Sequence, residues 1–200
     1  MMNLNTLLLR QRVHAALGFD CEAFQYSAQK STPAEIVARL ADFSTGLNAE
    51  CLHFVGHSLG GLLLMRMLTQ TPQLASGRAV LLGSPVVRSR AAEGLAESPF
   101  GRKLLGPAGM EELVLEQGRR WTGDREIGVI AGNSRFGLGH VIGRIEEEND
   151  GSIAVEETRL PGAHDHIVLP VSHSGMLFSL EVAQQVGHFL VHGAFDHRAQ

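Results

Sequence analysis

Residues 52–68 carry the sequence LHFVGHSLGGLLLMRML, in which a short apolar run is followed by glycines and then by a longer apolar run. The first run, residues 51–55, has the length of a buried strand and stops at Gly56. The second run, residues 59–68, is composed mostly of good helix formers, so a helix is expected there. Ser58 is therefore predicted to lie at a sharp turn between a strand and a helix.

This turn contains the pentapeptide Gly56-His57-Ser58-Leu59-Gly60, which matches the pattern Gly-x-Ser-x-Gly. The pattern alone is weak evidence in a chain with 23 glycines. Its position is more informative, because a tight bend between a strand and a helix can hold a serine in strained geometry with its hydroxyl exposed. Glycines leave room for the bend, and the free N–H groups of the following helix favour an oxyanion. The alternative is that Ser58 merely caps the helix.

Strands and helices alternate along the rest of the chain. Apolar residues at helical spacing predict helices at 4–17, 36–47 and 177–190. Short apolar runs predict strands at 19–26, 79–82, 127–131 and 166–171. Such alternation implies an α/β fold with a mostly parallel sheet and helices on both faces. We expect one domain over residues 1–200, with a small cap-like insertion at about 88–124 that contains a helical segment at 110–117.

The composition excludes several classes of function. The 17 Lys and Arg residues against 21 Asp and Glu residues give a net charge of −4, so nucleic acid is not an expected partner. The longest apolar stretch, residues 59–68, is shorter than the roughly 18 residues that span a membrane. No signal peptide is evident, and Cys21 and Cys51 both fall in predicted strands, where small buried thiols are more natural than a disulfide. A cytoplasmic protein is expected.

The sequence of residues 52–68 and the order of the predicted elements together resemble the α/β-hydrolase superfamily, in particular small lipase-like and esterase-like members with a Gly-His-Ser-Leu-Gly-Gly turn. The resemblance covers nearly the whole chain. It implies a catalytic triad in the chain order serine, acid, histidine, with Ser58 as the nucleophile. It also implies an oxyanion hole that uses the backbone N–H of Leu59, and neither a metal nor a cofactor.

A serine hydroxyl needs a nearby imidazole to take its proton. In the implied fold this histidine follows the last strand, and His173 lies just after the strand predicted at 166–171. The other nine histidines lie before or within predicted strands, on helices, in the tail or, for His140, in the loop after residues 127–131. We therefore expect His173 to be the base.

The imidazole in turn needs a carboxylate that fixes its tautomer. Asp150 lies in the turn-forming string Glu-Asn-Asp-Gly-Ser after the penultimate strand, and lipase-like relatives often place the acid in such a string. Asp150 is the expected acid, although it could also form only a local turn. The neighbouring acidic run 146–148 is an alternative source of the carboxylate, whereas Asp124 and Asp165 precede strands and have the wrong topology.

One expected part of the site is missing from the sequence. Relatives take a second oxyanion donor from a loop after an early strand, which commonly carries His-Gly. No apolar strand ending in His-Gly precedes Leu4, so the expected fold lacks the early strand before the first helix. A start codon assigned too late, a shortened chain or a divergent member in which residues 1–5 substitute would each explain this, and we favour the first.

The sequence thus predicts a serine hydrolase that cleaves a carboxylic ester, from a small molecule or a lipid, through an acyl-enzyme on Ser58. Apolar residues within 94–118 could line an acyl pocket or simply pack on the surface. Two alternatives use the same fold: a catalytically impaired protein that acts in binding, and an acyltransferase or thioesterase with the same triad. A metal cluster around His164 and His166 lacks a full ligand set. The acyl chain, the head group and the oligomeric state stay open.

Overall fold

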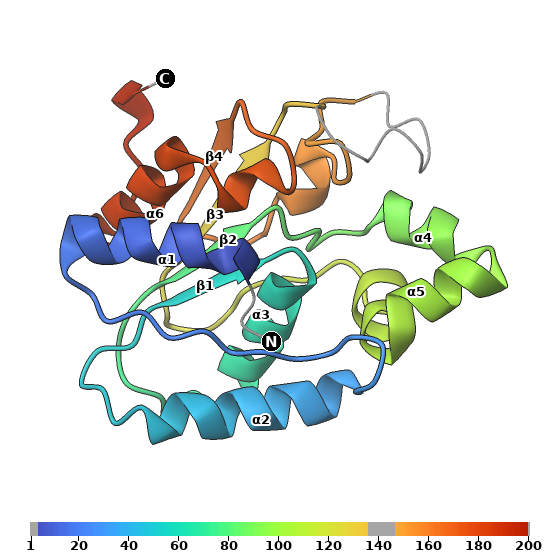
Figure 1. Cartoon of the computed structure of the whole chain (residues 1–200), viewed down its shortest axis with the longest axis horizontal. Coiled ribbons are helices and arrows are strands. Elements are labelled where there is room, and N and C mark those ends of the chain that lie inside the picture. The colour runs from blue at the N-terminus through green and yellow to red at the C-terminus, as the bar shows by residue number, and fades with distance from the viewer. Residues whose placement is uncertain (1–3, 136–146, 200) are drawn as a thin grey trace.

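The structure, a computed structural model, describes residues 4–135 and 147–199. His140 and Glu146, two of the candidates considered from the sequence, lie outside the described residues. Figure 1 shows a central sheet with helices on either side of it.

The sheet has four strands, β1 (Phe54–His57), β2 (Ala79–Leu82), β3 (Ile127–Gly132) and β4 (Asp165–Leu169). They are arranged in the order β1-β2-β3-β4, and every neighbouring pair is parallel. The predicted parallel sheet is therefore confirmed. Because the strands are parallel, their carboxyl ends all meet at one edge of the sheet, which is where ligands bind in open α/β folds.

Six α-helices accompany the sheet within the described residues: α1 (Leu4–Leu17), α2 (Pro33–Gly46), α3 (Leu59–Gln70), α4 (Arg90–Ala96), α5 (Pro99–Gly109) and α6 (Leu180–His192). Shorter turns of helix are η1 (Met110–Leu115, a π-helix), η3 (Val155–Thr158), η4 (Gly175–Leu177) and η5 (His197–Ala199). Helices α1 and α6 lie side by side, and so do α2 and α3 (Figure 1). The helices thus form two layers with the sheet between them.

Strand β2 shows how the two layers are held. Its four residues are fully buried, as expected for a central parallel strand covered on both faces. Ala79 and Leu81 pack into the core below α2 and α3, whereas Val80 and Leu82 pack into the core below α1 and α6. Side chains alternate between the two faces of a strand, so four consecutive apolar residues supply both cores.

Helix α2 begins at Pro33, three residues before the helix predicted at 36–47. The Glu35 N–H donates to the Thr32 hydroxyl at 3.3 Å, and the Thr32 N–H donates to the Glu35 carboxylate at 2.9 Å. This reciprocal pair is a capping box, and Pro33 occupies the first helical position, where its missing N–H costs nothing.

Between β2 and β3 the chain forms α4, α5 and η1, which lie together at one side of the sheet in Figure 1. The helix predicted at 110–117 is present as the π-helix η1. Glu112 on this turn is buried and pairs with Arg66 of α3 at 2.6 Å and with Arg119 at 2.9 Å. These two ion pairs offset the cost of burying the Glu112 carboxylate, and the pair with Arg66 links η1 to α3.

Residues 19–26, predicted as a strand, form no strand. Their backbone is held by side chains instead: Arg10 donates to the Cys21 carbonyl, and Arg39 donates to the Gln25 carbonyl at 3.3 Å. The local pattern of apolar and aromatic residues resembled a strand, but a strand also needs a partner whose backbone is free and within reach.

The two cysteines were also placed wrongly. Both are free thiols, Cys51 is exposed and Cys21 is half-buried. Strand β1 begins at Phe54, so Cys51 precedes it and makes only an isolated bridge with Ser76.

Strand β4 ends at Leu169, two residues earlier than predicted, because Pro170 has no N–H to continue the ladder.

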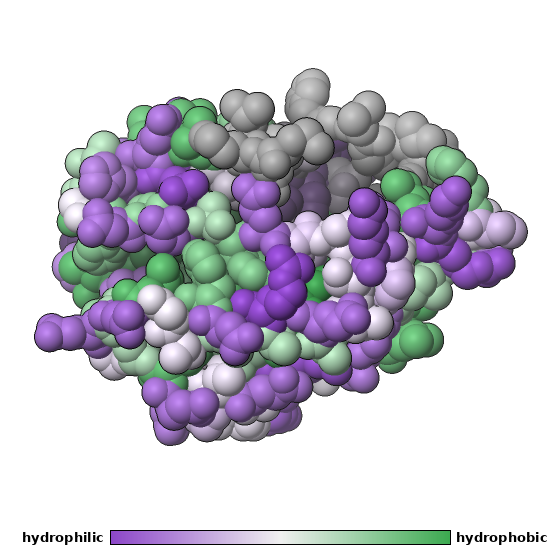
Figure 2. All heavy atoms as spheres, turned by 60° about the horizontal axis from the view of Figure 1, so that its bottom comes forward, coloured by the Kyte–Doolittle hydropathy of each residue, from purple (hydrophilic) through white to green (hydrophobic). Residues whose placement is uncertain are grey.

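No helix in residues 4–135 or 147–199 combines the length and the apolar character needed to cross a membrane. With the α2 side turned forward, Figure 2 shows hydrophilic and hydrophobic residues mixed over this face. Ile36 and Val37 of α2 are buried, as expected for an amphipathic helix whose apolar residues face the core.

We expect Leu81→Ala to lower the free energy of unfolding by about 2–5 kcal/mol, because it would leave a cavity in the fully buried centre of the sheet. Phe100 is 77% exposed, so the matched variant Phe100→Ala is expected to change stability by about 0.5 kcal/mol or less. Urea unfolding followed by circular dichroism measures both. Equal losses in the two variants would contradict the described core.

Candidate active site

The predicted site residues come from three loops that follow strands. Ser58 directly follows β1, Asp150 lies in the connection after β3, and His173 lies four residues after β4 ends. Since the strands are parallel, all three loops leave the sheet at its carboxyl edge. The topology therefore brings residues that are more than 100 positions apart to one place.

Ser58 has a backbone conformation that few residues other than glycine adopt, with φ of 54° and ψ of −126°. The Ser58 N–H donates to the Leu82 carbonyl at 2.8 Å, and the Ser58 carbonyl accepts from the Ser84 hydroxyl at 2.9 Å. Such strain, of order 1–3 kcal/mol, persists only where the surroundings fix it. The Ser58 side chain makes no capping hydrogen bond to α3, so the alternative that Ser58 merely caps the helix is wrong.

Two glycines allow strand β1 and helix α3 to come close enough for this bend. A Cβ on Gly56 would lie 2.6 Å from the Gly61 Cα, and a Cβ on Gly61 would lie 2.0 Å from the Ser84 Oγ. Both distances are too short for any side chain. By contrast, a Cβ on Gly60 would meet only the Tyr26 hydroxyl, at 3.5 Å. The steric role expected of Gly60 thus belongs to Gly61.

Asp150 and His173 are directly hydrogen-bonded, with 2.7 Å between the Asp150 Oδ2 and the His173 Nδ1. The Asp150 side chain is 1% exposed. Its other oxygen, Oδ1, accepts from the N–H groups of Ser152 at 2.9 Å and Ile153 at 2.7 Å. The local turn expected as an alternative for Asp150 is therefore present, and it leaves Oδ2 available to the histidine.

This contact determines the tautomer of His173. An ionised carboxylate only accepts hydrogen bonds, so the proton of a neutral His173 ring lies on Nδ1 and its Nε2 is an acceptor. A second hydrogen bond, from the His173 N–H to the Asp150 carbonyl at 2.9 Å, joins the two loops through their backbones. The contact with Asp150 thus fixes the tautomer in which Nε2 faces away from the carboxylate and can accept a proton.

Asp150 and His173 pack against two glycines at the ends of strands β2 and β3. A Cβ on Gly83, just after β2, would lie 3.1 Å from the His173 Nδ1 and 3.2 Å from the Asp150 Oδ2. A Cβ on Gly132, the last residue of β3, would lie 2.9 Å from the Asp150 Cβ. Neither glycine was singled out from the sequence, where the only available signal was that each ends a predicted strand.

His57 connects the serine turn to the histidine loop. The His57 Nε2–H donates to the His173 carbonyl at 2.9 Å, and the two rings lie 4.6 Å apart between centroids. Burial, together with the neighbouring His173, lowers the pKa of His57 to about 4. His57 is therefore neutral at physiological pH. The sequence placed it only within the turn and offered no sign of this contact.

The structure therefore joins Asp150 to His173 directly, and His57, the residue before Ser58, contacts His173. In the described part of the chain the Ser58 hydroxyl makes no hydrogen bond, to His173 or to any other group. Catalytic hydrogen bonds are often longer without substrate and shorten when it binds. The N–H of Leu59 lies in the first turn of α3, where backbone donors have no partner within the helix.

Two of the acidic residues considered as alternatives to Asp150, Glu147 and Glu148, make other contacts. The Glu147 carboxylate accepts from Arg90 at 2.7 Å, and Glu148 accepts from the Asn133 amide at 2.7 Å. No contact links either residue to His173 among the hydrogen bonds of the described residues. Asp150 is thus the carboxylate that holds the imidazole.

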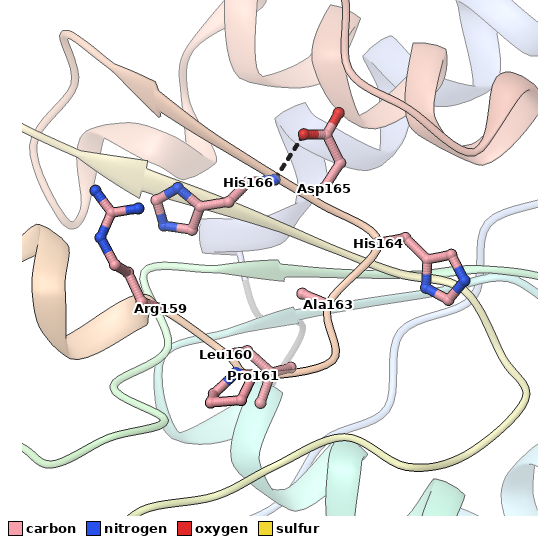
Figure 3. Close-up of a pocket in the computed structure, with 7 residues that line it drawn as sticks. All are labelled: Arg159, Leu160, Pro161, Ala163, His164, Asp165 and His166. Atoms are coloured by element: carbon pink, nitrogen blue, oxygen red, sulfur yellow. Dashed lines mark hydrogen bonds between the residues drawn. The ribbon is translucent and has the colours of Figure 1, made fainter.

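A hollow of about 470 Å³ lies elsewhere, where β4 begins (Figure 3). Its lining includes His164 and His166, which make separate contacts: His164 Nδ1 accepts from the Ile127 N–H at 3.4 Å, and His166 Nε2 lies 2.9 Å from the Thr158 hydroxyl. Within residues 4–135 and 147–199, no three His, Cys, Asp or Glu residues are grouped as metal ligands. This hollow lies at the opposite end of the strands from Ser58.

Sequence comparison finds no matching family model and no matching curated protein. Comparison of structures finds a lipase of Bacillus licheniformis in its mature form, 19% identical, with a TM-score of 0.57 over 80% of this chain and 71% of the lipase. An α/β-hydrolase fold protein of Chitinophaga pinensis is 13% identical, with a TM-score of 0.56 over 82% of this chain and 74% of that protein.

A meta-cleavage product hydrolase of Pseudomonas fluorescens is 13% identical, with a TM-score of 0.60 over 94% of this chain and 85% of the hydrolase. At such low identities the likeness establishes a common fold, and the parallel sheet between two helical layers agrees with it. The protein has the α/β-hydrolase fold.

Proposed function

We propose that the protein is a serine hydrolase that cleaves a carboxylic ester through an acyl-enzyme on Ser58. The observation that carries the proposal is the buried hydrogen bond between Asp150 and His173 beside the strained turn at Ser58. A carboxylate, an imidazole and a serine in this arrangement form the apparatus that makes a hydroxyl nucleophilic. The structural neighbours named as a lipase and as a hydrolase support this class of reaction.

In the first half-reaction, the Ser58 Oγ attacks the ester carbonyl carbon while its proton passes to the His173 Nε2. The carbonyl oxygen becomes an oxyanion, which the Leu59 N–H stabilises. When the intermediate collapses, the bond to the alcohol oxygen breaks and His173 gives its proton to the departing alcohol. Asp150 stabilises the imidazolium that exists between these two transfers. The acyl group is then bonded to Ser58.

In the second half-reaction, water attacks the acyl carbon, and His173 again takes a proton and returns it to the Ser58 oxygen. The products are a carboxylic acid and the free enzyme. A different acceptor, such as another alcohol, would make the same residues an acyltransferase, and a thioester substrate would make them a thioesterase. The proposed partner is a small-molecule or lipid ester, and the proposed domain comprises residues 1–200 with 88–124 as a cap-like insertion.

We expect Ser58→Ala to abolish covalent labelling by a fluorophosphonate probe and to lower the hydrolysis of p-nitrophenyl esters by about a thousandfold or more, because the proposed acyl-enzyme forms on Ser58. Ser98→Ala is the matched control, since Ser98 only caps α5. Equal labelling of both variants would contradict the proposal. A wild-type protein that unfolds cooperatively but neither reacts with the probe nor cleaves esters would favour the alternative of a binding protein.

We expect Asp150→Asn to reduce kcat about a thousandfold or more with little change in fold. An asparagine amide donates to the Nδ1 of His173 and places the ring proton on Nε2, where it blocks proton transfer from Ser58. Glu147→Gln is the control, because Glu147 pairs with Arg90 on the surface. Steady-state kinetics on one ester measures both variants. A comparable loss in Glu147→Gln would show that Asp150 is not the acid.

The proposal uses His173 and not His57 as the base, since the pKa of His57 is about 4. The unfolded chain binds a proton at this imidazole below about pH 6.5, whereas the folded protein does so only near pH 4. The contribution of neutral His57 to stability is therefore complete above pH 6.5 and is lost as the pH falls towards 4.

We expect the free energy of unfolding to fall more steeply between pH 6.5 and 4.5 in the wild type than in His57→Gln, by on the order of 1–3 kcal/mol. Glutamine does not titrate but can still donate to the His173 carbonyl. Urea unfolding at several pH values measures the two slopes. Burial also lowers the pKa of His53 and His166, so the difference between the two proteins is the relevant quantity. Identical slopes would contradict the assignment.

A further inference from the structure

Glu157, in the short helix η3, carries a second buried carboxylate near Asp150, and the proposed mechanism does not use it. The Glu157 side chain is 3% exposed. Its Oε2 accepts from the Ala154 N–H at 2.9 Å. Its Oε1 accepts from the backbone N–H of Arg90 at 2.9 Å and from the Nε–H of the same residue at 3.1 Å. One carboxylate is therefore bonded both to its own loop and to the start of α4.

The loop side of this contact is adjacent to the groups that hold Asp150. Ala154 directly follows Ile153. The Ile153 N–H donates to the Asp150 Oδ1 at 2.7 Å, and the Ile153 carbonyl accepts from the Asp150 N–H at 3.0 Å. Ala154 also forms an antiparallel bridge with Asn149, the residue before Asp150. The position of Ala154 therefore affects the backbone groups that bond Asp150.

The other side of the contact is the segment that leads from β2 into α4. The backbone carbonyl of Glu157 accepts from the Val87 N–H at 3.0 Å. Arg90 is the first residue of α4, and its Nη1–H also donates to Glu147 at 2.7 Å. The Glu147 side chain is 52% exposed, so solvent weakens this second ion pair. The segment is thus attached to the Asp150 loop mainly through Glu157.

The hydrogen bonds at Glu157 require a carboxylate. The Ala154 N–H points at one oxygen and two N–H groups of Arg90 point at the other, and an ionised carboxylate accepts at both oxygens. A glutamine has one oxygen and one NH2 group, so it would turn a donor towards either Ala154 or Arg90. The Arg90 guanidinium also offsets the cost of burying the negative charge.

We propose that Glu157 is a positioning residue of the active site, which holds the loop of Asp150 so that the Asp150 Oδ2 reaches His173. Glu157 acts through Asp150 and not on the reacting atoms, because its bonds end on Ala154 and Arg90. This inference rests on the proposed function and adds one residue to it. Placement matters for such a site, since a displacement of about 1 Å can cost about a hundredfold in rate.

The loss of this attachment should lower kcat and leave KM nearly unchanged. A displaced Asp150 carboxylate stabilises the imidazolium of His173 less, and that imidazolium exists only after proton transfer has begun. The bound ester precedes this charge, so its affinity does not depend on the position of Asp150. A purely structural role for Glu157 would instead lower stability without a specific effect on kcat.

The first test compares Glu157→Gln with Glu112→Gln. Glu112 is a matched control, because its side chain is 2% exposed and pairs with Arg66 and Arg119 rather than with the Asp150 loop. We expect kcat for a p-nitrophenyl ester to fall about fivefold to fiftyfold in Glu157→Gln, with KM within about twofold. Glu112→Gln should change kcat by less than about twofold. Both proteins are assayed at a temperature at which circular dichroism shows them folded.

A second variant, Arg90→Gln, keeps the test decisive if Glu157→Gln does not fold. It removes the guanidinium but retains the backbone N–H that bonds Glu157, so a smaller fall in kcat, about twofold to tenfold, is expected. The double variant should lose no more than the more impaired single variant, because both residues act through one contact. Glu147→Gln removes only the exposed partner of Arg90 and should retain kcat.

A proton NMR signal reports the position of Asp150 without turnover. The Nδ1–H of His173 donates to a buried carboxylate, and such a charge-assisted hydrogen bond moves the proton resonance far downfield. Asp150→Asn identifies the signal, because it removes the accepting oxygen. We expect the signal to move upfield or to broaden in Glu157→Gln and to stay unchanged in Glu112→Gln.

The outcomes separate the two proposals. If the wild type neither hydrolyses esters nor reacts with a fluorophosphonate at Ser58, the proposed function is wrong and this inference is overturned with it. If the wild type is active but Glu157→Gln retains its kcat and its downfield signal, only the role of Glu157 is overturned. Equal losses of kcat in Glu157→Gln and Glu112→Gln, or a fall in kcat with an unchanged signal, would also overturn it.

Discussion

The contact between the end of β1 and the start of α3 is the constraint on which the site depends. A side chain on Gly56 would meet Gly61, and one on Gly61 would meet Ser84, while Ser58 between these two glycines has a positive φ of 54°. The Ser84 hydroxyl and the Leu82 carbonyl then fix both backbone groups of Ser58. The strain at one residue is offset by packing of the elements on both sides of it.

The second constraint is the buried carboxylate of Asp150, whose two oxygens hydrogen-bond different partners. One oxygen of Asp150 shapes its own loop, and the other orients the ring of His173. Neutral His57 then holds the backbone of His173 from the side of Ser58. The segments around the ends of β1, β3 and β4 are thereby linked to one another, and the imidazole of His173 has its Nδ1 engaged by Asp150.

The sequence was most informative where local chemistry suffices. The end of α1 before Gly18 and the buried strand β2 were both predictable, because each depends on neighbours a few residues away. It misled at residues 19–26, where a strand-like pattern has no partner strand, and at Cys51, which lies outside β1. Strand formation depends on what is within reach in space, which a local pattern does not contain.

By itself, the sequence determined the four strands of the sheet, the helices α1, α2, α3 and α6, the turn at Ser58 and a short set of candidate residues near it, since these follow from periodicity and from residue chemistry. Only the tertiary structure decided that Asp150 rather than Glu147 or Glu148 meets His173, that Gly61 carries the close contact, and that Glu157 meets Arg90. These contacts join residues far apart in the chain, and the parallel packing of the strands determines which of these residues come close together in space.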